Sequence, residues 1–255
     1  MRSIAVPLRR LVSVFVISVL VVSVPAADVT VFAAASLSDA LREIAPLYTK
    51  ATGDTLRFNF GASGALARQI KEGALADVIV SADELRVDQL EQAGLLAPGP
   101  RRTILANQLV VVVAAENGAP IAALADLARP EVKRIAIGEP ATVPVGTYAK
   151  EHLQKLDLWS QVSTKCVPLD NVRAVLAAVE AGNADAGFVY RTDARGSKKV
   201  RIAVTVPPGA GPKILYPAAA LRDAKEPAAA ARFVAFLARP EAQAVFATYG
   251  FLPAP

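Results

Sequence analysis

The sequence predicts an α/β fold with two lobes, each a mostly parallel sheet flanked by helices. Short apolar strands alternate with helical segments along the chain, and this alternation is typical of parallel sheets with crossover helices. It occurs in two series that an extended middle separates. The run Leu109–Ala115 in this middle is continuously apolar, which is typical of a strand buried on both faces. Two such series predict two similar lobes with a cleft between them.

The expected elements follow from this alternation and from the residues that stop each helix. In the first series strands are predicted at 29–34, 56–60 and 77–81, and helices at 37–49, 65–72 and 84–93. In the second series strands are predicted at 134–137, 164–167 and 187–190, and helices at 145–155 and 172–181. Extended segments at 200–206 and 213–221 precede two final helices, at about 227–238 and 240–249, each beginning with a proline.

The final helices need an apolar surface to cover, and the first series offers one. We therefore expect lobe I to comprise 28–106 plus 216–255, and lobe II to comprise 107–215. This division places the continuous apolar run at the start of lobe II.

The first 26 residues have the pattern of a signal peptide. Arg2, Arg9 and Arg10 form a basic region before the uninterrupted apolar run Leu11–Val24, and small residues allow cleavage after Ala26. The run has 14 residues, fewer than the roughly 20 that span a bilayer. No cysteine follows it, so a lipid anchor is not expected. We predict a periplasmic protein whose signal peptide, 1–26, is removed.

The composition excludes several classes of function. Removal of 26 residues with three arginines lowers the formal charge from +5 to +2, so nothing calls for a nucleic-acid partner. Cys166 and His152 are the single cysteine and the single histidine, so neither an intrachain disulfide nor a Cys/His zinc site can form.

Two serines follow neighbouring predicted strands, and each lies where a helix begins. Ser36 begins the helix after the first strand, and Ser63 lies in the turn after the second, among residues as small as Gly61 and Gly64. Ligands of open α/β sheets bind beyond the carboxyl ends of the strands, where helix N-termini attract anions. The simpler alternative is that each serine only caps its helix.

Ser63 also allows a hydrolase reading, because its turn resembles the nucleophile elbow Gly-x-Ser-x-Gly. The last position of that pattern is Ala65 here, and the base of a Ser–His pair has to be His152. That histidine lies in a helix rich in charged residues, where a surface position is the simpler interpretation.

Three more segments offer donors at the ends of predicted strands. Val145 follows Pro144, which has no N–H of its own, so the free donors there are Val145 and Gly146. Val172 begins another predicted helix, and Tyr190 ends a strand, where a core position is the commoner role.

Seven segments occur in the order of one known family. They are F-A-A-A-S-L, F-G-A-S-G-A-L-A-R-Q-I, A-D-V-I-V-S-A-D, N-Q-L-V-V-V, G-E-P-A-T-V-P-V-G-T-Y-A-K-E, D-N-V-R-A-V-L-A-A-V-E and Y-G-F. Through them the sequence resembles the periplasmic molybdate-binding proteins of molybdate ABC importers, over essentially the whole chain after the leader. The resemblance implies a two-lobed periplasmic binding protein type II fold that holds an oxyanion between its lobes and catalyses nothing.

The resemblance assigns five ligand-binding residues. Ser36 and Ser63 would donate their hydroxyl and N–H groups, Val145 and Val172 their backbone N–H groups, and Tyr190 its phenol. Two positions depart from the family. A serine-rich run is replaced by Gly61-Ala62-Ser63-Gly64, and Val145 stands where alanine is common. The partners implied are molybdate or tungstate and a membrane permease, with no cofactor, no direct ligand to a metal cation, no nucleic acid and a monomeric chain.

Neutral donors are sufficient for a tetrahedral dianion. Several helix N-termini, each with about half a positive charge, offset its charge without a lysine. A closed cage of fixed donors selects by size, so molybdate and tungstate fit better than sulfate, although another tetrahedral oxyanion such as sulfate stays an alternative. A protonated phosphate would leave its O–H unpaired, at a cost of about 1–3 kcal/mol.

Overall fold

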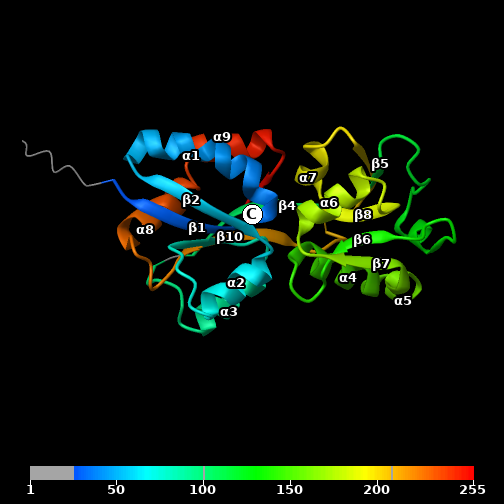
Figure 1. Ribbon diagram of the computed structural model, residues 1–255, viewed down its shortest axis with the longest axis horizontal. Helices are drawn as coiled ribbons and strands as arrows, with labels where there is room; N and C mark the ends of the chain where they lie inside the picture. Colours follow the sequence, from blue (N-terminus) through cyan, green and yellow to red (C-terminus); the bar gives the residue numbers. More distant parts are fainter. Residues whose placement is uncertain (1–25, 100, 208) are drawn as a thin grey trace, which may run out of the picture.

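The computed structural model describes residues 26–99, 101–207 and 209–255. Apart from Ala26, the predicted signal peptide lies outside these residues. The described chain forms two α/β lobes side by side (Figure 1), as the sequence predicts. Within the described ranges, no helix has the length and apolar character needed to cross a membrane.

Lobe I is built on a six-stranded sheet in the order β11-β4-β10-β3-β1-β2. Its strands are β1 (Asp28–Ala34), β2 (Thr55–Gly61), β3 (Val78–Val80), β4 (Arg102–Asn107), β10 (Ile214–Ala220) and β11 (Leu252–Pro253). Lobe II is built on a five-stranded sheet in the order β7-β6-β8-β5-β9. Its strands are β5 (Leu109–Ala114), β6 (Ile135–Gly138), β7 (Cys166–Leu169), β8 (Ala186–Tyr190) and β9 (Val200–Thr205).

Both sheets are mixed, so the expectation of mostly parallel sheets is wrong for the strands on one side of each. The pairs β1/β2, β1/β3, β6/β7 and β6/β8 are parallel, whereas β4, β5, β9, β10 and β11 pair antiparallel with their neighbours. Parallel pairing requires a crossover helix between strands. The chain passes directly from β4 to β5, and from β9 to β10, as it changes lobes, so the alternation of strand and crossover helix is interrupted at these strands.

The alternation of side chains along the strands places helices on both faces of the lobe I sheet. Phe32, Ile79 and Ala219 pack with α2 (Ser63–Lys71) and α3 (Glu84–Gln92). The neighbouring residues Val31, Val80 and Ala218 face the opposite way and belong to the larger core. That face is covered by α1 (Ser38–Thr52), α8 (Pro227–Phe236) and α9 (Pro240–Thr248), and α1 packs on α9 (Figure 1).

The remaining helices belong to lobe II or to turns. They are α4 (Pro144–Lys155), α5 (Trp159–Val162), α6 (Val172–Glu180), α7 (Arg191–Arg195) and the 3₁₀ helices η1 (Ala35–Leu37), η2 (Leu124–Ala128) and η3 (Ser163–Lys165). Buried Val175, Leu176 and Val179 fix the inner face of α6.

The register of the parallel pairs places helix starts next to one another. Ala34 of β1 pairs with Gly61 of β2, so η1 and α2 begin side by side. Gly138 of β6 pairs with Leu169 of β7, so the loops that lead into α4 and α6 also start side by side. These four helix starts lie at the carboxyl ends of their strands, where binding sites of open α/β sheets form.

Candidate functional site

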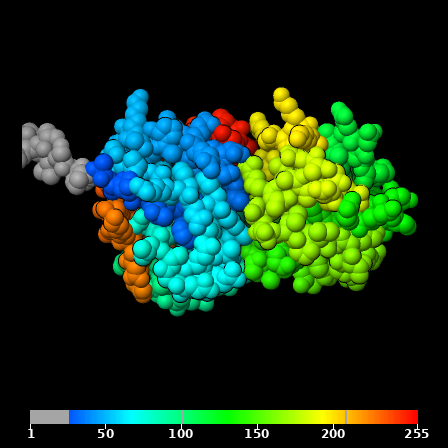
Figure 2. Space-filling view, viewed as in Figure 1, coloured from blue at the N-terminus to red at the C-terminus, as the bar shows by residue number. Residues whose placement is uncertain are grey.

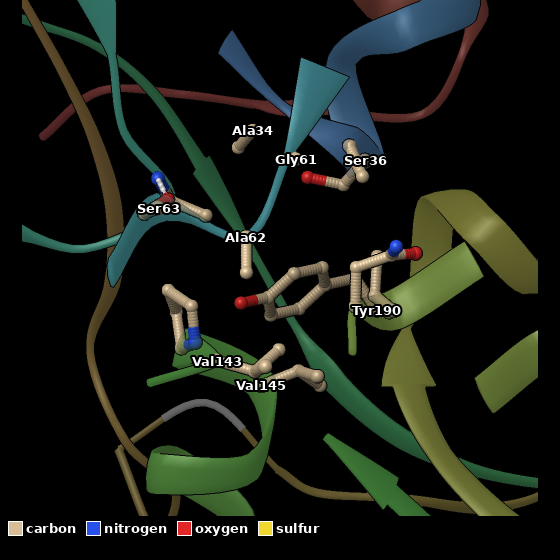
Figure 3. Close-up of a pocket in the computed structure, with 13 residues that line it drawn as sticks. Ala34, Ser36, Gly61, Ala62, Ser63, Val143, Val145 and Tyr190 are labelled. Atoms are coloured by element: carbon tan, nitrogen blue, oxygen red, sulfur yellow. Dashed lines mark hydrogen bonds between the residues drawn. The ribbon is translucent and has the colours of Figure 1, made fainter. Parts of the chain in front are cut away.

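A small pocket lies where the two lobes meet, at the ends of β1, β2 and β8 and the starts of α2, α4 and α6. Its empty space is about 210 Å³, including the opening to solvent. The residues that line it are Ala34, Ala35, Ser36, Gly61, Ala62, Ser63, Ala82, Val143, Pro144, Val145, Asn171, Val172 and Tyr190. All five residues singled out from the sequence are among them, and Figure 3 shows four of these labelled around one space.

Ser36 lies in the middle of η1 and is only 4% exposed. It is not an N-cap, because Ala34 occupies that position and no side chain caps the turn. The Ser36 hydroxyl instead lies 3.1 Å from the hydroxyl of Tyr216 in β10. The capping role considered from the sequence is therefore wrong for Ser36, and its hydroxyl faces the pocket (Figure 3).

Ser63 is the first residue of α2 and is 1% exposed. The N-cap is Ala62, again without a side-chain cap, so the capping role is wrong for this serine too. The Ser63 oxygen accepts the backbone N–H of Ala82 at 2.9 Å. Because this bond uses the serine as an acceptor, the hydroxyl proton of Ser63 is left to donate elsewhere.

Two backbone N–H groups reach the pocket from lobe II helix starts. Val145 is the second residue of α4, and the first turn of a helix leaves its N–H groups without intrahelical partners. The N–H of Gly146, expected to be free, is bonded to the carbonyl of Val143 at 2.9 Å. Val172 is the first residue of α6, and the side chain of the N-cap Asn171 accepts from Arg173 and Ala174, so this cap does not engage the Val172 N–H.

Tyr190 ends β8 with its ring buried and its hydroxyl at the pocket (Figure 3). The side chain is 1% exposed, and its oxygen has no hydrogen-bond partner among the described residues. Burial raises the pKa of this phenol well above its usual range. The hydroxyl therefore stays protonated, and a buried donor without an acceptor is costly unless a ligand supplies one.

The pocket is electrostatically suited to an anion although no lysine or arginine lines it. Its walls include the N-terminal residues of α2, α4 and α6, whose dipoles place partial positive charge there. Hydroxyl groups of two serines and one tyrosine complete a set of donors. Among the described residues no group of three His, Cys, Asp or Glu side chains is placed to hold a metal cation.

The lobes are in contact around the pocket, and the space-filling view shows them meeting along a continuous seam (Figure 2). The N–H of Gly64 in α2 donates to the carbonyl of Thr142 in lobe II at 3.1 Å. On the same side, Arg86 of α3 donates to the carbonyl of Ala141 at 2.7 Å. A Cβ at Gly64 would stand 2.3 Å from the Thr142 oxygen, so the absence of a side chain permits this approach.

The geometry does not support a Ser–His pair. His152 is 5% exposed, so the expected surface position is wrong, and its Nδ1 has no partner within the described residues. It lies two turns along α4 from the pocket, and no hydrogen bond joins it to Ser63, whose oxygen is held by Ala82. Desolvation lowers the pKa of His152, in the manner of a core histidine.

Three residues that support the pocket serines were not predicted from the sequence. Tyr216 and Asn107 contact the site through a hydrogen-bond chain to Ser36, and Ala82 fixes Ser63. Tyr216 is 180 residues from Ser36 along the chain, and Ala82 is 19 residues from Ser63. No local pattern connects residues so far apart, so only the tertiary structure reveals them.

Comparison with known proteins decides the family. The sequence model of the family described as bacterial extracellular solute-binding protein matches residues 29–252. The chain belongs to this family. It is thus a solute-binding protein rather than an enzyme, as predicted, and the hydrolase alternative has no support. The family's extracellular description agrees with the predicted export.

Two relatives show how far the similarity extends along this solute-binding protein. The putative ABC transporter substrate-binding lipoprotein YvgL of Bacillus subtilis is 42% identical over 223 residues, covering 87% of this chain and 85% of its own. The molybdate-binding protein ModA of Escherichia coli is 38% identical over 233 residues, covering 88% of each chain. The resemblance to periplasmic molybdate-binding proteins that the sequence motifs indicated is thereby confirmed.

Solved structures agree with the two-lobed fold. The Azotobacter vinelandii periplasmic molybdate-binding protein matches with a TM-score of 0.79 at 26% identity, covering 89% of this chain and all of that one. The sulfate-binding protein SubI from Mycobacterium tuberculosis also has a TM-score of 0.79, covering 89% of this chain and 87% of its own. Its identity is only 20%, so this second likeness concerns the fold alone.

Proposed function

We propose that this protein captures molybdate or tungstate in the periplasm and delivers it to the membrane permease of an ABC importer. The observation that carries the proposal is the pocket between the lobes, which brings donors from both lobes together and has no lysine or arginine in its lining. Ser36, Ser63 and Tyr190 would supply hydroxyl groups, and Val145 and Val172 backbone N–H groups. The names of the relatives from Escherichia coli and Haemophilus influenzae, the latter 34% identical, agree with this ligand.

The arrangement of the donors explains how an anion is held without a counter-charge. The two serine hydroxyl groups approach from lobe I, whereas the two valine N–H groups and the Tyr190 phenol approach from lobe II. A tetrahedral oxyanion between them accepts from both lobes at once, so binding favours the closed arrangement. We infer that the two lobes close on the ligand by a hinge motion of the two connecting segments, which lie between β4 and β5 and between β9 and β10.

The same proposal covers whether the exported protein carries a lipid anchor and whether it has other partners. The Bacillus subtilis relative is described as a lipoprotein, and lipid attachment requires a cysteine next to the leader. Cys166 is the only cysteine of this chain and lies far from the leader, so we infer a cleaved signal peptide without lipid attachment. A monomeric chain without a cofactor belongs to the same proposal. Nucleic acid is not expected as a partner, because the mature chain has a formal charge of only +2.

Calorimetry on the mature chain with molybdate, tungstate, sulfate and phosphate tests the proposal. Molybdate and tungstate are expected to bind much more tightly than sulfate, and phosphate is expected to bind poorly because its proton meets only donors. Comparable affinity for sulfate would contradict selection by size, and absence of binding to any of these oxyanions would overturn the proposed function.

A further inference from the structure

Tyr216 lies behind the pocket and contacts a ligand-facing residue without lining the pocket itself. It is fully buried in β10, and its hydroxyl oxygen lies 3.1 Å from the Ser36 oxygen and 3.1 Å from Nδ2 of Asn107. Its ring packs edge-on against Tyr190 and Phe251, with centroids 6.1 and 5.5 Å away. A buried hydroxyl with two partners has a defined direction for its single proton.

Asn107 determines that direction. Its Oδ1 accepts the backbone N–H of Gln108 at 2.9 Å, and its Nδ2 donates to the hydroxyl oxygen of Thr192 at 3.0 Å. Turning the amide over would set its NH₂ group against the N–H of Gln108, donor against donor. The NH₂ group of Asn107 therefore faces Tyr216, and the Tyr216 oxygen accepts from it.

The proton of Tyr216 then has one acceptor among the described residues, the Ser36 oxygen. Burial raises the pKa of the Tyr216 phenol, so this proton is retained at neutral pH. Because Ser36 accepts from Tyr216, the Ser36 proton is released from this contact. Ser36 faces the pocket, so its proton is directed there.

We propose that Tyr216 is a positioning residue that, by donating to Ser36, turns the Ser36 proton toward the pocket, so that this corner presents a donor to the ligand. The proposal rests on the proposed oxyanion function and deepens it. The Ser63 oxygen likewise accepts, from the backbone N–H of Ala82, so both serines can present their protons to the ligand. The class of ligand selected is the fully deprotonated tetrahedral oxyanion. Anions that carry a proton at neutral pH, such as hydrogen arsenate, leave their O–H without an acceptor.

The variant Tyr216→Phe removes this hydroxyl and keeps the ring. The Ser36 hydroxyl can then rotate and accept from a protonated ligand, so the ratio of molybdate to arsenate affinity is expected to fall about 3- to 10-fold, within the range of one hydrogen bond. Molybdate affinity itself is expected to fall about 2- to 12-fold, the range of one lost hydrogen bond. The matched control is Tyr249→Phe, which removes a hydroxyl that donates to Glu43 on the surface at 2.8 Å and is expected to change neither quantity.

A double-mutant cycle with Ser36→Ala separates positioning from a general structural effect. If Tyr216 acts through Ser36, then Tyr216→Phe has no further effect on molybdate affinity in the Ser36→Ala background. Should Tyr216→Phe prove poorly folded in a thermal unfolding check, Asn107→Leu is measured instead. It removes the donor that directs the Tyr216 proton, and it is expected to lower the molybdate-to-arsenate ratio as well.

Each outcome decides one question. If the wild-type chain binds molybdate and the ratio is unchanged in these variants, Tyr216 is not a positioning residue, although the proposed function stands. The same conclusion follows if Tyr216→Phe weakens binding equally with and without Ser36. A wild-type chain that binds no oxyanion overturns the proposed function and the role of Tyr216 together.

Discussion

Arg173 of lobe II and Asp39 of lobe I form an ion pair across the seam between the lobes, with Nη2 and Oδ2 2.7 Å apart. The Nε of the same arginine lies 3.2 Å from Oδ1 of Asp193, which is completely buried, although without hydrogen-bond geometry. One guanidinium thus lies between two carboxylates from different lobes.

This ion cluster lies next to the pocket in the sequence as well as in space. Asp39 follows Ser36 by one helical turn, and Arg173 directly follows Val172 in α6. Both elements therefore place a pocket donor and a member of the pair together. We infer that the pair forms only in the closed arrangement that brings the donors together.

The variant Asp39→Asn should weaken ligand binding slightly by removing this pair. The side chains of Asp39 and Arg173 are 49% and 32% exposed, and such pairs contribute about 0.2–1 kcal/mol, less at high salt. We expect molybdate affinity to fall no more than about 5-fold in dilute buffer, and the loss to shrink at high salt.

The control for this variant is Asp28→Asn, which removes the exposed pair between Asp28 and Arg57 within lobe I, also 2.7 Å long. Calorimetry at two salt concentrations measures both variants. Equal losses in the two, or a loss of affinity independent of salt, would show that the pair across the seam has no special part in closure.

Gly64→Ala should oppose closure without harming the fold. The added Cβ would meet the carbonyl oxygen of Thr142 at 2.3 Å, and this oxygen belongs to backbone of the other lobe. Alanine is the better helix former, so ligand-free stability should be unchanged or higher by up to about 1 kcal/mol. Molybdate affinity should fall about 10-fold or more, because relief of this overlap requires the lobes to part.

Gly196→Ala is the matched control, since its Cβ would make only an ordinary contact at 3.5 Å with the carbonyl of Asp193. Small-angle X-ray scattering with ligand would show Gly64→Ala as more extended than wild type. If Gly64→Ala binds molybdate normally and scatters like wild type, the backbone at Thr142 can move to accept the added Cβ without opening the lobes.

The parallel half of each lobe was predictable because its signals are local. Alternating strands and helices, with Gly73 after α2 and Gly182 after α6, determine the strand–helix units to within a few residues. A donor at the start of a helix that follows a strand is also a local feature. The positions of Ser36 and Ser63 at the pocket therefore followed from their places in the sequence, and the resemblance to a family added Val145, Val172 and Tyr190.

The antiparallel half was harder to predict because it depends on contacts between distant segments. The strand β4, which pairs with β10 and β11, was not predicted. Its terminal residues, Arg102 and Asn107, are polar, so the segment does not have the apolar pattern of a buried strand. The burial of His152 was missed because charged neighbours such as Lys150 and Glu151 suggested a solvent-facing helix. In α4, His152 is buried whereas its neighbour Glu151 is exposed.

Ser36→Ala and Ser63→Ala should each weaken molybdate binding by about 1–3 kcal/mol, as expected for hydrogen bonds to a charged ligand. They should differ in the ligand-free protein. Ser63→Ala leaves the buried N–H of Ala82 without its acceptor and should lower the unfolding free energy measurably. Ser160→Ala, an exposed serine of α5, serves as control. Unchanged affinity in either pocket variant would exclude that serine from the site.

Tyr190→Phe should separate binding from stability. The Tyr190 hydroxyl is buried without a partner among the described residues, so its removal relieves an unpaired polar group in the ligand-free protein. We expect the unfolding free energy to stay equal or rise by up to about 1–3 kcal/mol, while molybdate affinity falls. Chemical denaturation and calorimetry on the same preparation measure both. A loss of stability with unchanged affinity would show that the hydroxyl has a structural partner instead.

Asp193 should make the ligand-free protein less stable as the pH rises from about 4 to 7. Burial raises the pKa of this carboxyl from 3.8 to about 7, and the charge of Arg173 only partly opposes that effect. Between pH 3.8 and about 7 this carboxyl is protonated in the folded state and ionised in the unfolded state. Its contribution to the unfolding free energy is therefore fully present below pH 4. It is lost as the pH rises through the folded-state pKa, with a slope of at most about 1.4 kcal/mol per pH unit.

The difference in unfolding free energy between wild type and Asp193→Asn isolates this contribution from other titrating groups. Asparagine keeps an oxygen that can accept the N–H of Tyr190, as the carboxylate does at 3.2 Å, so the turn after β8 is preserved. Relative to this variant, wild type should lose stability from pH 4 to 7 and stay level above that. If wild type instead gains stability over this range, the attraction of Arg173 outweighs burial, and Asp193 is ionised at neutral pH.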